Sequence, residues 1–383
     1  MRKRDCIYVT VIALLIGCLL GMLRFGTVPG AGGKLGEIAV LIQQCFIGEA
    51  DPEAMEDAAA AAMVAATGDR WSRYMTKEEY ALYVQQMKNA VVGVGVTVQA
   101  REDNQGLDVI SVVSGGPAHM AGIQPGDVLV GVDGQDARDR ELSEVAQWIR
   151  GKEGTEVKLT VLRDGQETVY SVCRKSIPTP VVEGKLINGN LGLVRIVNFD
   201  DRCAAEGSAA VEQLIADGAR ALIFDVRNNP GGYRHELVKL LDYLLPEGIL
   251  FQSVDYSGKE ETDRSDANCV ALPMAVLVNA DSYSAAEFFA AALREYEWAT
   301  VVGQQTSGKG YFQVVYQLTD GSAVGLSIGK YVTPKGVSLE GVGITPDHVV
   351  EVDQKTASAI YSGKLDPMED PQILAAIEAL KGK

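Results

Sequence analysis

The 383-residue sequence has few of the residues from which many metal and disulfide sites are built. It contains three histidines and six cysteines, and no two cysteines are spaced as C-x-x-C. A zinc site made of histidine or cysteine clusters is therefore not expected. A disulfide scaffold would require a higher density of cysteine than this chain has. We expect no metal and no other cofactor.

Positive charge is also scarce, because 35 lysines and arginines stand against 51 aspartates and glutamates, for a net charge of −16. Such a chain lacks the broadly basic surface that nucleic acids require, so no nucleic-acid partner is expected. The 41 glycines show no triplet period, which excludes a collagen. The 47% of hydrophobic residues suffice for a packed core, and the length suggests two or three domains.

An uncharged segment follows three basic residues at the N-terminus. It runs from Cys6 to Leu23, and as a helix it would be about 27 Å long, close to the hydrocarbon thickness of a bilayer. The basic residues favour an N-terminus inside the cell. We predict an uncleaved signal anchor over residues 1–24, with the chain after Arg24 outside a bacterial cytoplasmic membrane. A cleaved signal peptide with secretion, or a lipoprotein processed at Cys18, are the alternatives.

Shifts in composition divide the remaining chain into four parts. Residues 25–88 begin with a glycine-rich tether and continue with a helical pattern. Residues 89–174 show short alternating strands and one helix, which is typical of a small antiparallel module. Strands and helices alternate over residues 175–352, which indicates an α/β core, and residues 353–383 form a polar helical tail. The expected fold class is multidomain α+β, with a membrane helix, a helical segment, a β-rich module and an α/β core.

The β-rich module resembles a PDZ domain. The resemblance is carried by Val112 to Ala118, Ala121 to Leu129 and Val132-Asp133-Gly134, followed by a helix. PDZ domains bind the C-terminus of a peptide as an added strand at a sheet edge.

A candidate carboxylate-binding loop precedes these motifs. Gly93, Val94, Gly95 and Val96 offer backbone N–H groups with little side-chain bulk, which suits a terminal carboxylate. Taken alone, the two glycines would indicate only the start of a strand.

A second set of motifs lies in the α/β core and resembles the C-terminal processing peptidases, or tail-specific proteases, which are serine peptidases with a Ser–Lys pair. The motifs occur in a fixed order along residues 35 to 350: Asp69 to Tyr74, Phe224 to Gly232, Asn279 to Glu287, Gly308-Lys309-Gly310 with Gln313, Tyr331 to Pro334, and Gly341 to Asp347. The resemblance implies a crotonase-like (ClpP-like) peptidase core. The family often has Gly-Ser-Ala-Ser-Ala-Ser-Glu at the serine motif, where this chain has Asp281, Tyr283 and Ala286.

The resemblance assigns Ser284 as nucleophile, Lys309 as general base and Gln313 as the residue that orients the lysine. The chemistry is consistent, because a serine hydroxyl needs a base and a lysine serves once burial lowers its pKa. Lys309 lies between glycines in an apolar neighbourhood. Gln313 is four residues further on, and a regular strand would separate the two by about 13 Å, so their contact requires a bend at Gly310.

The oxyanion hole is predicted from three backbone N–H groups, those of Gly231, Gly232 and Ala285. The glycines follow an apolar strand, and without a Cβ their backbone can approach a substrate carbonyl closely. Ser284 precedes a predicted helix over Ala285 to Glu297, whose N-terminus favours negative charge. Ser284-x-x-Glu287 is also a capping box, so Ser284 alone would indicate only a helix cap.

Two other enzyme classes fit parts of the sequence. Gly303 to Lys309 matches the first seven positions of a phosphate-binding P-loop, but Gly310 replaces the Ser or Thr that would bind Mg²⁺. A histidine-based serine hydrolase would have to use His119, His235 or His348, none of which has the sequence context of a Ser–His–Asp triad.

The predicted function is a membrane-anchored serine endopeptidase that recognises substrate C-termini through the PDZ-like module and cleaves through an acyl-enzyme. The expected partners are proteins or peptides with free C-termini. The resemblance also implies a homo-oligomer, a dimer formed through helices near residues 35–88 and after 350, although such helices are equally consistent with packing within the chain. The alternative is a catalytically inactive PDZ scaffold at the membrane.

Overall fold

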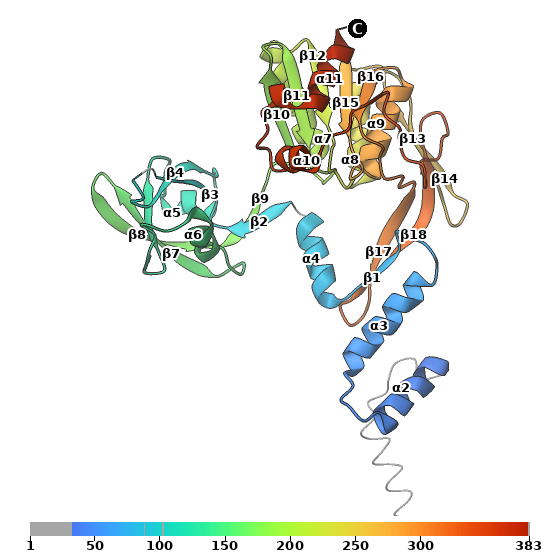
Figure 1. Ribbon diagram of the computed structural model, residues 1–383, viewed down its shortest axis with the longest axis horizontal. Coiled ribbons are helices and arrows are strands. Elements are labelled where there is room, and N and C mark those ends of the chain that lie inside the picture. Colours follow the sequence, from blue (N-terminus) through green and yellow to red (C-terminus); the bar gives the residue numbers. More distant parts are fainter. Residues whose placement is uncertain (1–32, 88, 102, 382–383) are drawn as a thin grey trace, which may run out of the picture.

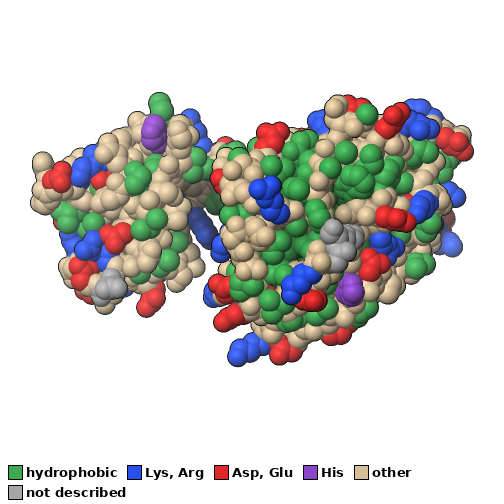
Figure 2. Space-filling view, turned by 90° about the horizontal axis from the view of Figure 1, so that it is seen from above, with side chains coloured by type: hydrophobic (Ala, Val, Ile, Leu, Met, Phe, Trp, Pro, Cys, Tyr) green, Lys and Arg blue, Asp and Glu red, His purple; other side chains and the backbone are tan. Residues whose placement is uncertain are grey.

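The computed structural model describes residues 33–381 except 88 and 102, and it consists of two lobes joined by a narrow ribbon (Figures 1 and 2). The predicted signal anchor lies outside the described residues. Within the described part, none of the helices combines the length and apolarity needed to cross a membrane. The same residues contain no group of His, Cys, Asp and Glu side chains arranged to hold a metal ion.

The N-terminal part is helical, as expected, with one short strand that the sequence did not predict. Helix α3 begins after Asp51, whose side chain accepts hydrogen bonds from the backbone N–H groups of Glu53 and Ala54. The added strand β1 pairs antiparallel with β18 of the large lobe, so this segment is attached to the core. The elements are α2 (Lys34–Cys45), α3 (Pro52–Ala65), β1 (Arg73–Met75) and α4 (Lys77–Met87).

The small lobe is an antiparallel sheet in the order β3-β4-β5-β7-β8, with two helices. Strand β7 alternates between buried and more exposed residues, and Val157, Leu159 and Val161 point into the core. Asp164 and Gly165 both have positive φ, as a two-residue hairpin turn between β7 and β8 requires. Its elements are β3 (Val96–Ala100), β4 (Leu107–Val112), α5 (Pro117–Ala121), β5 (Val128–Val132), β6 (Gln135–Asp136), α6 (Leu142–Ile149), β7 (Glu156–Arg163) and β8 (Gln166–Cys173).

A two-stranded antiparallel ribbon carries the chain into and out of this lobe. It consists of β2 (Ala90–Gly93) and β9 (Lys175–Pro178), which pair along their whole length. The ribbon crosses from the end of α4 to the small lobe in Figure 1.

The large lobe is built on a six-stranded sheet in the order β10-β11-β12-β15-β16-β19, in which all neighbours except β10 and β11 are parallel. Every residue of β12 and β15 is buried, as expected for central strands covered on both faces. The strands are β10 (Val182–Ile187), β11 (Leu191–Ile196), β12 (Ala221–Asp225), β15 (Met274–Val278), β16 (Ala299–Gly303) and β19 (His348–Val349).

Helices cover both faces of this sheet. One face packs against α7 (Cys203–Ala216), α8 (Arg234–Leu244) and α9 (Ala285–Glu295). The other face is covered by α11 (Pro371–Leu380), whose Ile373, Ala376 and Leu380 are buried against it. The tail was expected to be polar, and this is wrong for α11, because one side of the helix completes the core. Before it come α10 (Gln354–Tyr361) and a single 3₁₀ turn, η1 (Pro367–Glu369).

A second sheet, which the sequence did not predict, lies beside the first. Its order is β1-β18-β13-β14, and β17 pairs with β18 as a hairpin. The strands are β13 (Gly248–Asp255), β14 (Glu260–Ser265), β17 (Tyr311–Gln317) and β18 (Ala323–Val332). The chain is thus a mixed, multidomain fold with a β-rich module and an α/β core, as expected.

Candidate active site

Ser284 lies in the tight turn between β15 and α9 and caps the N-terminus of that helix. Its φ of 58° is in the left-handed region, which is unfavourable for a residue with a side chain and is concentrated at functional sites. The residue is only 6% exposed, and its Oγ lies 3.4 Å from the hydroxyl of Tyr331. This agrees with the expected position of the nucleophile at a helix N-terminus, where negative charge is stabilised.

Glu287, one turn along α9, is completely buried and accepts four hydrogen bonds. Its Oε2 accepts from the backbone N–H groups of Ser284 (3.0 Å) and Lys309 (2.8 Å). Its Oε1 accepts from the Thr306 hydroxyl (2.5 Å) and the Gly308 N–H (2.8 Å). The sequence predicted only the contact with Ser284, as half of a capping box; the link to Lys309 was not predicted.

Lys309 projects its amine toward two aromatic rings. The Nζ atom lies 5.1 Å from the centroid of Trp71 and 5.6 Å from that of Tyr283, and the two rings stack at 6.3 Å. Burial, and secondarily repulsion from Arg73, lowers the pKa of Lys309 to about 8. A pKa this close to neutrality leaves a useful fraction of neutral amine, as a general base requires.

The segment just before β1 holds the Lys309 loop in place. The guanidinium of Arg70 donates to the carbonyl oxygens of Ser307 (3.1 Å) and Gly308 (2.8 Å). Glu340 accepts from the indole N–H of Trp71 (3.1 Å) and from the backbone N–H of Gly310 (2.8 Å). The motif from Asp69 to Tyr74 was noted in the sequence without a role, because only the fold brings it to the lysine.

Ser284 is buried and Lys309 is half-buried, and among the described residues no hydrogen bond joins the hydroxyl to the amine. The partner of the Ser284 Oγ is Tyr331, whose pKa is raised by burial to about 12. Tyr331 therefore keeps its proton near neutral pH and does not act as a base. Lys309, with its lowered pKa, remains the candidate base.

Gln313 does not contact Lys309 in this structure. Its side-chain amide donates to the hydroxyl of Ser327 and to the carbonyl oxygen of Tyr311, both at 3.0 Å. Strand β17 has a register shift between Phe312 and Gln313, which places the glutamine opposite Ser327 of β18. The predicted contact with Lys309 is therefore not made, and the glutamine amide is bound within the β17–β18 hairpin instead.

The turn of Gly231 and Gly232 lies directly against the nucleophile. A Cβ on Gly231 would lie 2.8 Å from the Cβ of Ser284. The Gly231 N–H donates to the side chain of Asn229 (2.8 Å) and is occupied. Among the described residues, the N–H groups of Gly232 and Ala285 have no acceptor. Of the three predicted donors, these two are available to an oxyanion.

Asp225 and Arg227 form a buried ion pair at the end of β12. Two guanidinium nitrogens of Arg227 contact the carboxylate of Asp225 at 2.8 and 2.6 Å. A third nitrogen donates to Asp370 and to Gln372 at the start of α11, both at 2.8 Å. The pair therefore fastens the C-terminal helix to the end of β12.

The geometry favours neither alternative enzyme class. His235 is exposed, with its Nε2 3.3 Å from Asp201, and no described histidine contacts Ser284. The N–H groups of Gly308 and Lys309, which would cradle a phosphate in a P-loop, are bound to Glu287.

The four residues of the predicted carboxylate-binding loop do not lie in one element. Gly93 is the last residue of β2, opposite Lys175 in the ribbon, and Val96 begins β3. Val94 and Gly95 form the connection between them, where Gly95 has a φ of 80°. Gly93 thus belongs to the ribbon, and the loop is reduced to the other three residues.

Family models match both lobes of the chain. Residues 109–163 match the PDZ domain model, and residues 190–350 match the model of peptidase family S41. The large lobe belongs to peptidase family S41. The candidate nucleophile, base and glycine turn all lie within the S41 match, and both resemblances expected from the sequence are confirmed.

Curated relatives of this chain are described as probable CtpA-like serine proteases. The protein of Staphylococcus haemolyticus is 36% identical over 297 residues, covering 76% of this chain and 59% of the relative. That of Staphylococcus aureus strain COL is 32% identical over 322 residues, covering 83% and 64%. The chain thus spans about three-fifths of the length of these relatives. The family and these homologues are those of a serine-type peptidase.

A solved structure also shares the overall fold. The crystal structure of a putative S41 protease from Bacteroides fragilis superposes with a TM-score of 0.50 at 17% identity, covering 91% of this chain and 98% of that one. At this identity the likeness concerns the fold alone.

Proposed function

We propose that this chain is a serine endopeptidase of the C-terminal processing type, in which Ser284 forms an acyl-enzyme. The observation that carries the proposal is the shared carboxylate of Glu287, which fixes the backbone of both Ser284 and Lys309. Beside this pair, the N–H groups of Gly232 and Ala285 have no acceptor among the described residues and can donate hydrogen bonds to an oxyanion.

The reaction follows from these positions. The neutral amine of Lys309 takes the proton of the Ser284 hydroxyl, and Oγ attacks the carbonyl carbon of the scissile peptide bond. The oxyanion of the tetrahedral intermediate accepts hydrogen bonds from Gly232 and Ala285. The Lys309 ammonium then gives its proton to the leaving amine, and water hydrolyses the ester with Lys309 again acting as base.

The deciding experiment compares Ser284→Ala, Lys309→Ala and His235→Ala on an unfolded protein substrate. Ser284→Ala should abolish cleavage, Lys309→Ala should reduce it by several orders of magnitude, and His235→Ala should have no effect. Full activity of the pure Lys309→Ala protein would overturn the mechanism. The inactive-scaffold alternative predicts that wild type and Ser284→Ala are equally inactive.

Substrate choice is assigned to the PDZ module. Val94, Gly95 and Val96 are proposed to bind a substrate's terminal carboxylate through backbone N–H groups, with α6 opposite β3. A peptide with a free C-terminus should then be cleaved faster than the same peptide with an amidated one. Deleting the module should remove the difference, whereas equal rates in the full chain would reject carboxylate recognition and leave the peptidase assignment intact.

Location and assembly complete the proposal. Residues 1–24 are proposed to anchor the chain once in a bacterial cytoplasmic membrane with the peptidase outside. Protease added to intact spheroplasts should then digest the domain, and full protection would refute this orientation.

A homodimer is supported by apolar side chains exposed on α2, including Leu35 (55%) and Leu41 (59%). Light scattering of the soluble fragment tests for the dimer.

A further inference from the structure

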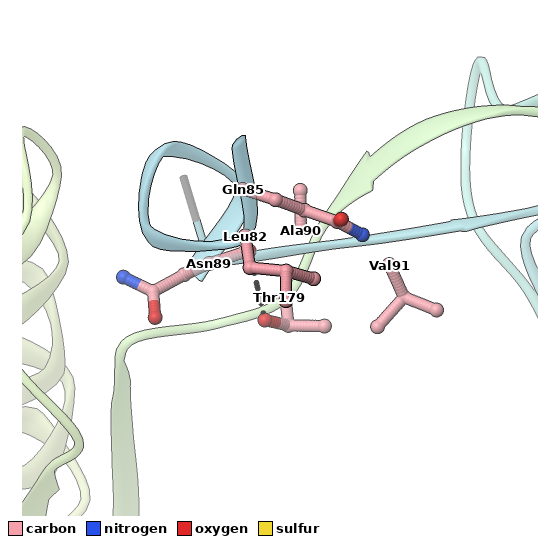
Figure 3. A pocket seen from close by; sticks show the side chains of 6 residues that line it. All are labelled: Leu82, Gln85, Asn89, Ala90, Val91 and Thr179. Atoms are coloured by element: carbon pink, nitrogen blue, oxygen red, sulfur yellow. Dashed lines mark hydrogen bonds between the residues drawn. The ribbon is translucent and has the colours of Figure 1, made fainter. Parts of the chain in front are cut away.

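Asn89 is the last residue before the ribbon that carries the PDZ module, and its side chain is bound to the peptidase lobe. Its amide forms a reciprocal pair with the amide of Asn198, in which both hydrogen bonds are 2.7 Å long. The same Nδ2 also donates to the carboxylate of Asp200 at 2.8 Å. Asn89 also helps to line a hollow with Leu82 and Val91, and in Figure 3 its amide extends to the side opposite Val91.

Phe199, which lies between Asn198 and Asp200, binds the Gly231–Gly232 turn through its backbone. Its N–H donates to the carbonyl oxygen of Gly231 (2.8 Å), and its carbonyl oxygen accepts from the N–H of Tyr233 (2.6 Å). Gly232 lies so close that a Cβ there would be 2.3 Å from the Phe199 carbonyl oxygen. The side chains of segment 198–200 therefore bind Asn89, and its backbone binds the turn that contains Gly231 and Gly232.

This segment has little freedom to move independently. Phe199 is completely buried, and its ring lies 5.8 Å from that of Phe289 in α9, the helix that Ser284 caps. Asp200 is 4% exposed and also binds the guanidinium of Arg202 at 2.7 Å. A packed segment of this kind passes a displacement at one contact to the next instead of absorbing it.

We propose that Asn89 is a positioning residue for the oxyanion donors, acting through segment 198–200 on the Gly231–Gly232 turn. The inference rests on the proposed peptidase function and adds to it a residue more than a hundred positions away in sequence from the turn that it positions. Oxyanion donors act mainly in the transition state, so a misplaced turn lowers kcat more than it changes KM.

The test uses two matched changes at the start of the ribbon. Asn89→Gly removes the amide but keeps a residue that accepts the φ of 41° found there. Thr179→Val is the control, because it removes a hydroxyl that donates to the Asn89 carbonyl oxygen but touches neither Asn198 nor Asp200. Asn89→Gly should lower kcat about tenfold or more with KM within about twofold, and Thr179→Val should match wild type.

A double-mutant cycle identifies the route. Asn198→Ala should lower kcat to a similar extent, and combining it with Asn89→Gly should add little, because both remove the same link. Additive losses, or a kcat for Asn89→Gly equal to that of an active wild type, would overturn the proposal. Thermal unfolding of each variant shows whether a loss of kcat reflects global instability.

Hydrogen exchange separates this proposal from the peptidase assignment. In a Ser284→Ala background, where no turnover occurs, Asn89→Gly should accelerate exchange of the backbone amides at residues 231–233, and Thr179→Val should not. If wild type cleaves nothing, the peptidase proposal fails and this measurement still decides the link. Unchanged exchange at the turn would refute it.

Discussion

The backbone N–H groups of Ser284 and Lys309 donate to the same atom, Oε2 of Glu287, at 3.0 and 2.8 Å. The residues are 25 positions apart in the printed numbering, yet one oxygen sets the relative position of their main chains. The other carboxylate oxygen holds Thr306 and Gly308 and completes the attachment of the loop to the helix. The Ser284 turn and the Lys309 loop are thus held together by one carboxylate.

Glu287→Gln should damage both stability and activity. A glutamine has one acceptor oxygen, so its NH₂ group would face two of the four donors that the carboxylate now satisfies. We expect a loss of unfolding free energy on the order of 3 kcal/mol and a drop in kcat of at least about a hundredfold. Urea unfolding and peptidase assays measure the two effects.

The control is Glu295→Gln at the other end of the same helix. Glu295 is only partly buried and accepts from the Thr333 hydroxyl (2.6 Å) and the Lys335 N–H (2.8 Å). Its replacement should cost less than about 1 kcal/mol and leave kcat unchanged. Equal effects at the two positions would show that Glu287 has no special role.

Peptidase activity should rise with pH through the pKa of Lys309. Burial and the positive charge of Arg73 lower this pKa to about 8, and the neutral form that acts as base predominates above it. Arg73→Met should raise the pKa, so the ascending limb of log kcat/KM should move to higher pH. Lys77→Gln, which removes an exposed cation paired with Glu53, should leave the profile unchanged.

Lys309→Met should be more stable than wild type near pH 7. The unfolded lysine, with a pKa near 10.5, binds its proton more tightly than the folded one, with a pKa of about 8. The folded chain therefore carries a penalty of up to about 3 kcal/mol below pH 8, which fades as pH rises toward 10.5. Thermal or urea unfolding at pH 7 and pH 10 should show the stability advantage of the variant shrinking; a constant difference would contradict a lowered pKa.

Gly231→Ala should abolish activity by displacing the nucleophile. Its φ is 88°, and the new Cβ would meet the Ser284 Cβ at 2.8 Å and the Ala285 nitrogen at 2.9 Å. Gly218→Ala is a matched control, since its φ of 100° imposes similar backbone strain while open space surrounds the new methyl group. Both should lose about 1 kcal/mol or more of stability, but only Gly231→Ala should lose cleavage.

Arg227→Gln should strongly destabilise the large lobe. It would leave the buried carboxylates of Asp225 and Asp370 without their cation, which typically costs about 3–5 kcal/mol. Arg138 also lies between two carboxylates, but near the surface, so Arg138→Gln should cost less than about 1 kcal/mol. Chemical denaturation compares the two, and similar losses would mean that α11 is not held by this ion pair.

The sequence predicted those features that depend on local pattern. The helix predicted over Ala285 to Glu297 is present over Ala285–Glu295, and Ser284 caps it as expected. Buried strands such as Met274–Val278 were recognisable as short apolar runs. The glycine turn was expected beside Ser284, and the structure places it in contact.

Features that depend on distant contacts were not predictable in the same way. Strand β1 has three residues and exists because β18, about 250 positions later, pairs with it. Trp71 reaches Lys309 through that pairing, and no local pattern signals it. The role of Gln313 was taken from the resemblance, and its hydrogen bond to Ser327 depends on the pairing with β18, which no local pattern reveals.

The ribbon of β2 and β9 makes the small lobe an insertion whose two attachment points lie side by side. Asn89 precedes β2 and Thr179 follows β9. The N–H and the hydroxyl of Thr179 both donate to the carbonyl oxygen of Asn89, each at 2.8 Å. A short hairpin turn could therefore close the gap left by residues 90–178 without moving either end of the core. We therefore expect that another domain with adjacent chain ends could be inserted between Asn89 and Thr179 in place of the PDZ module.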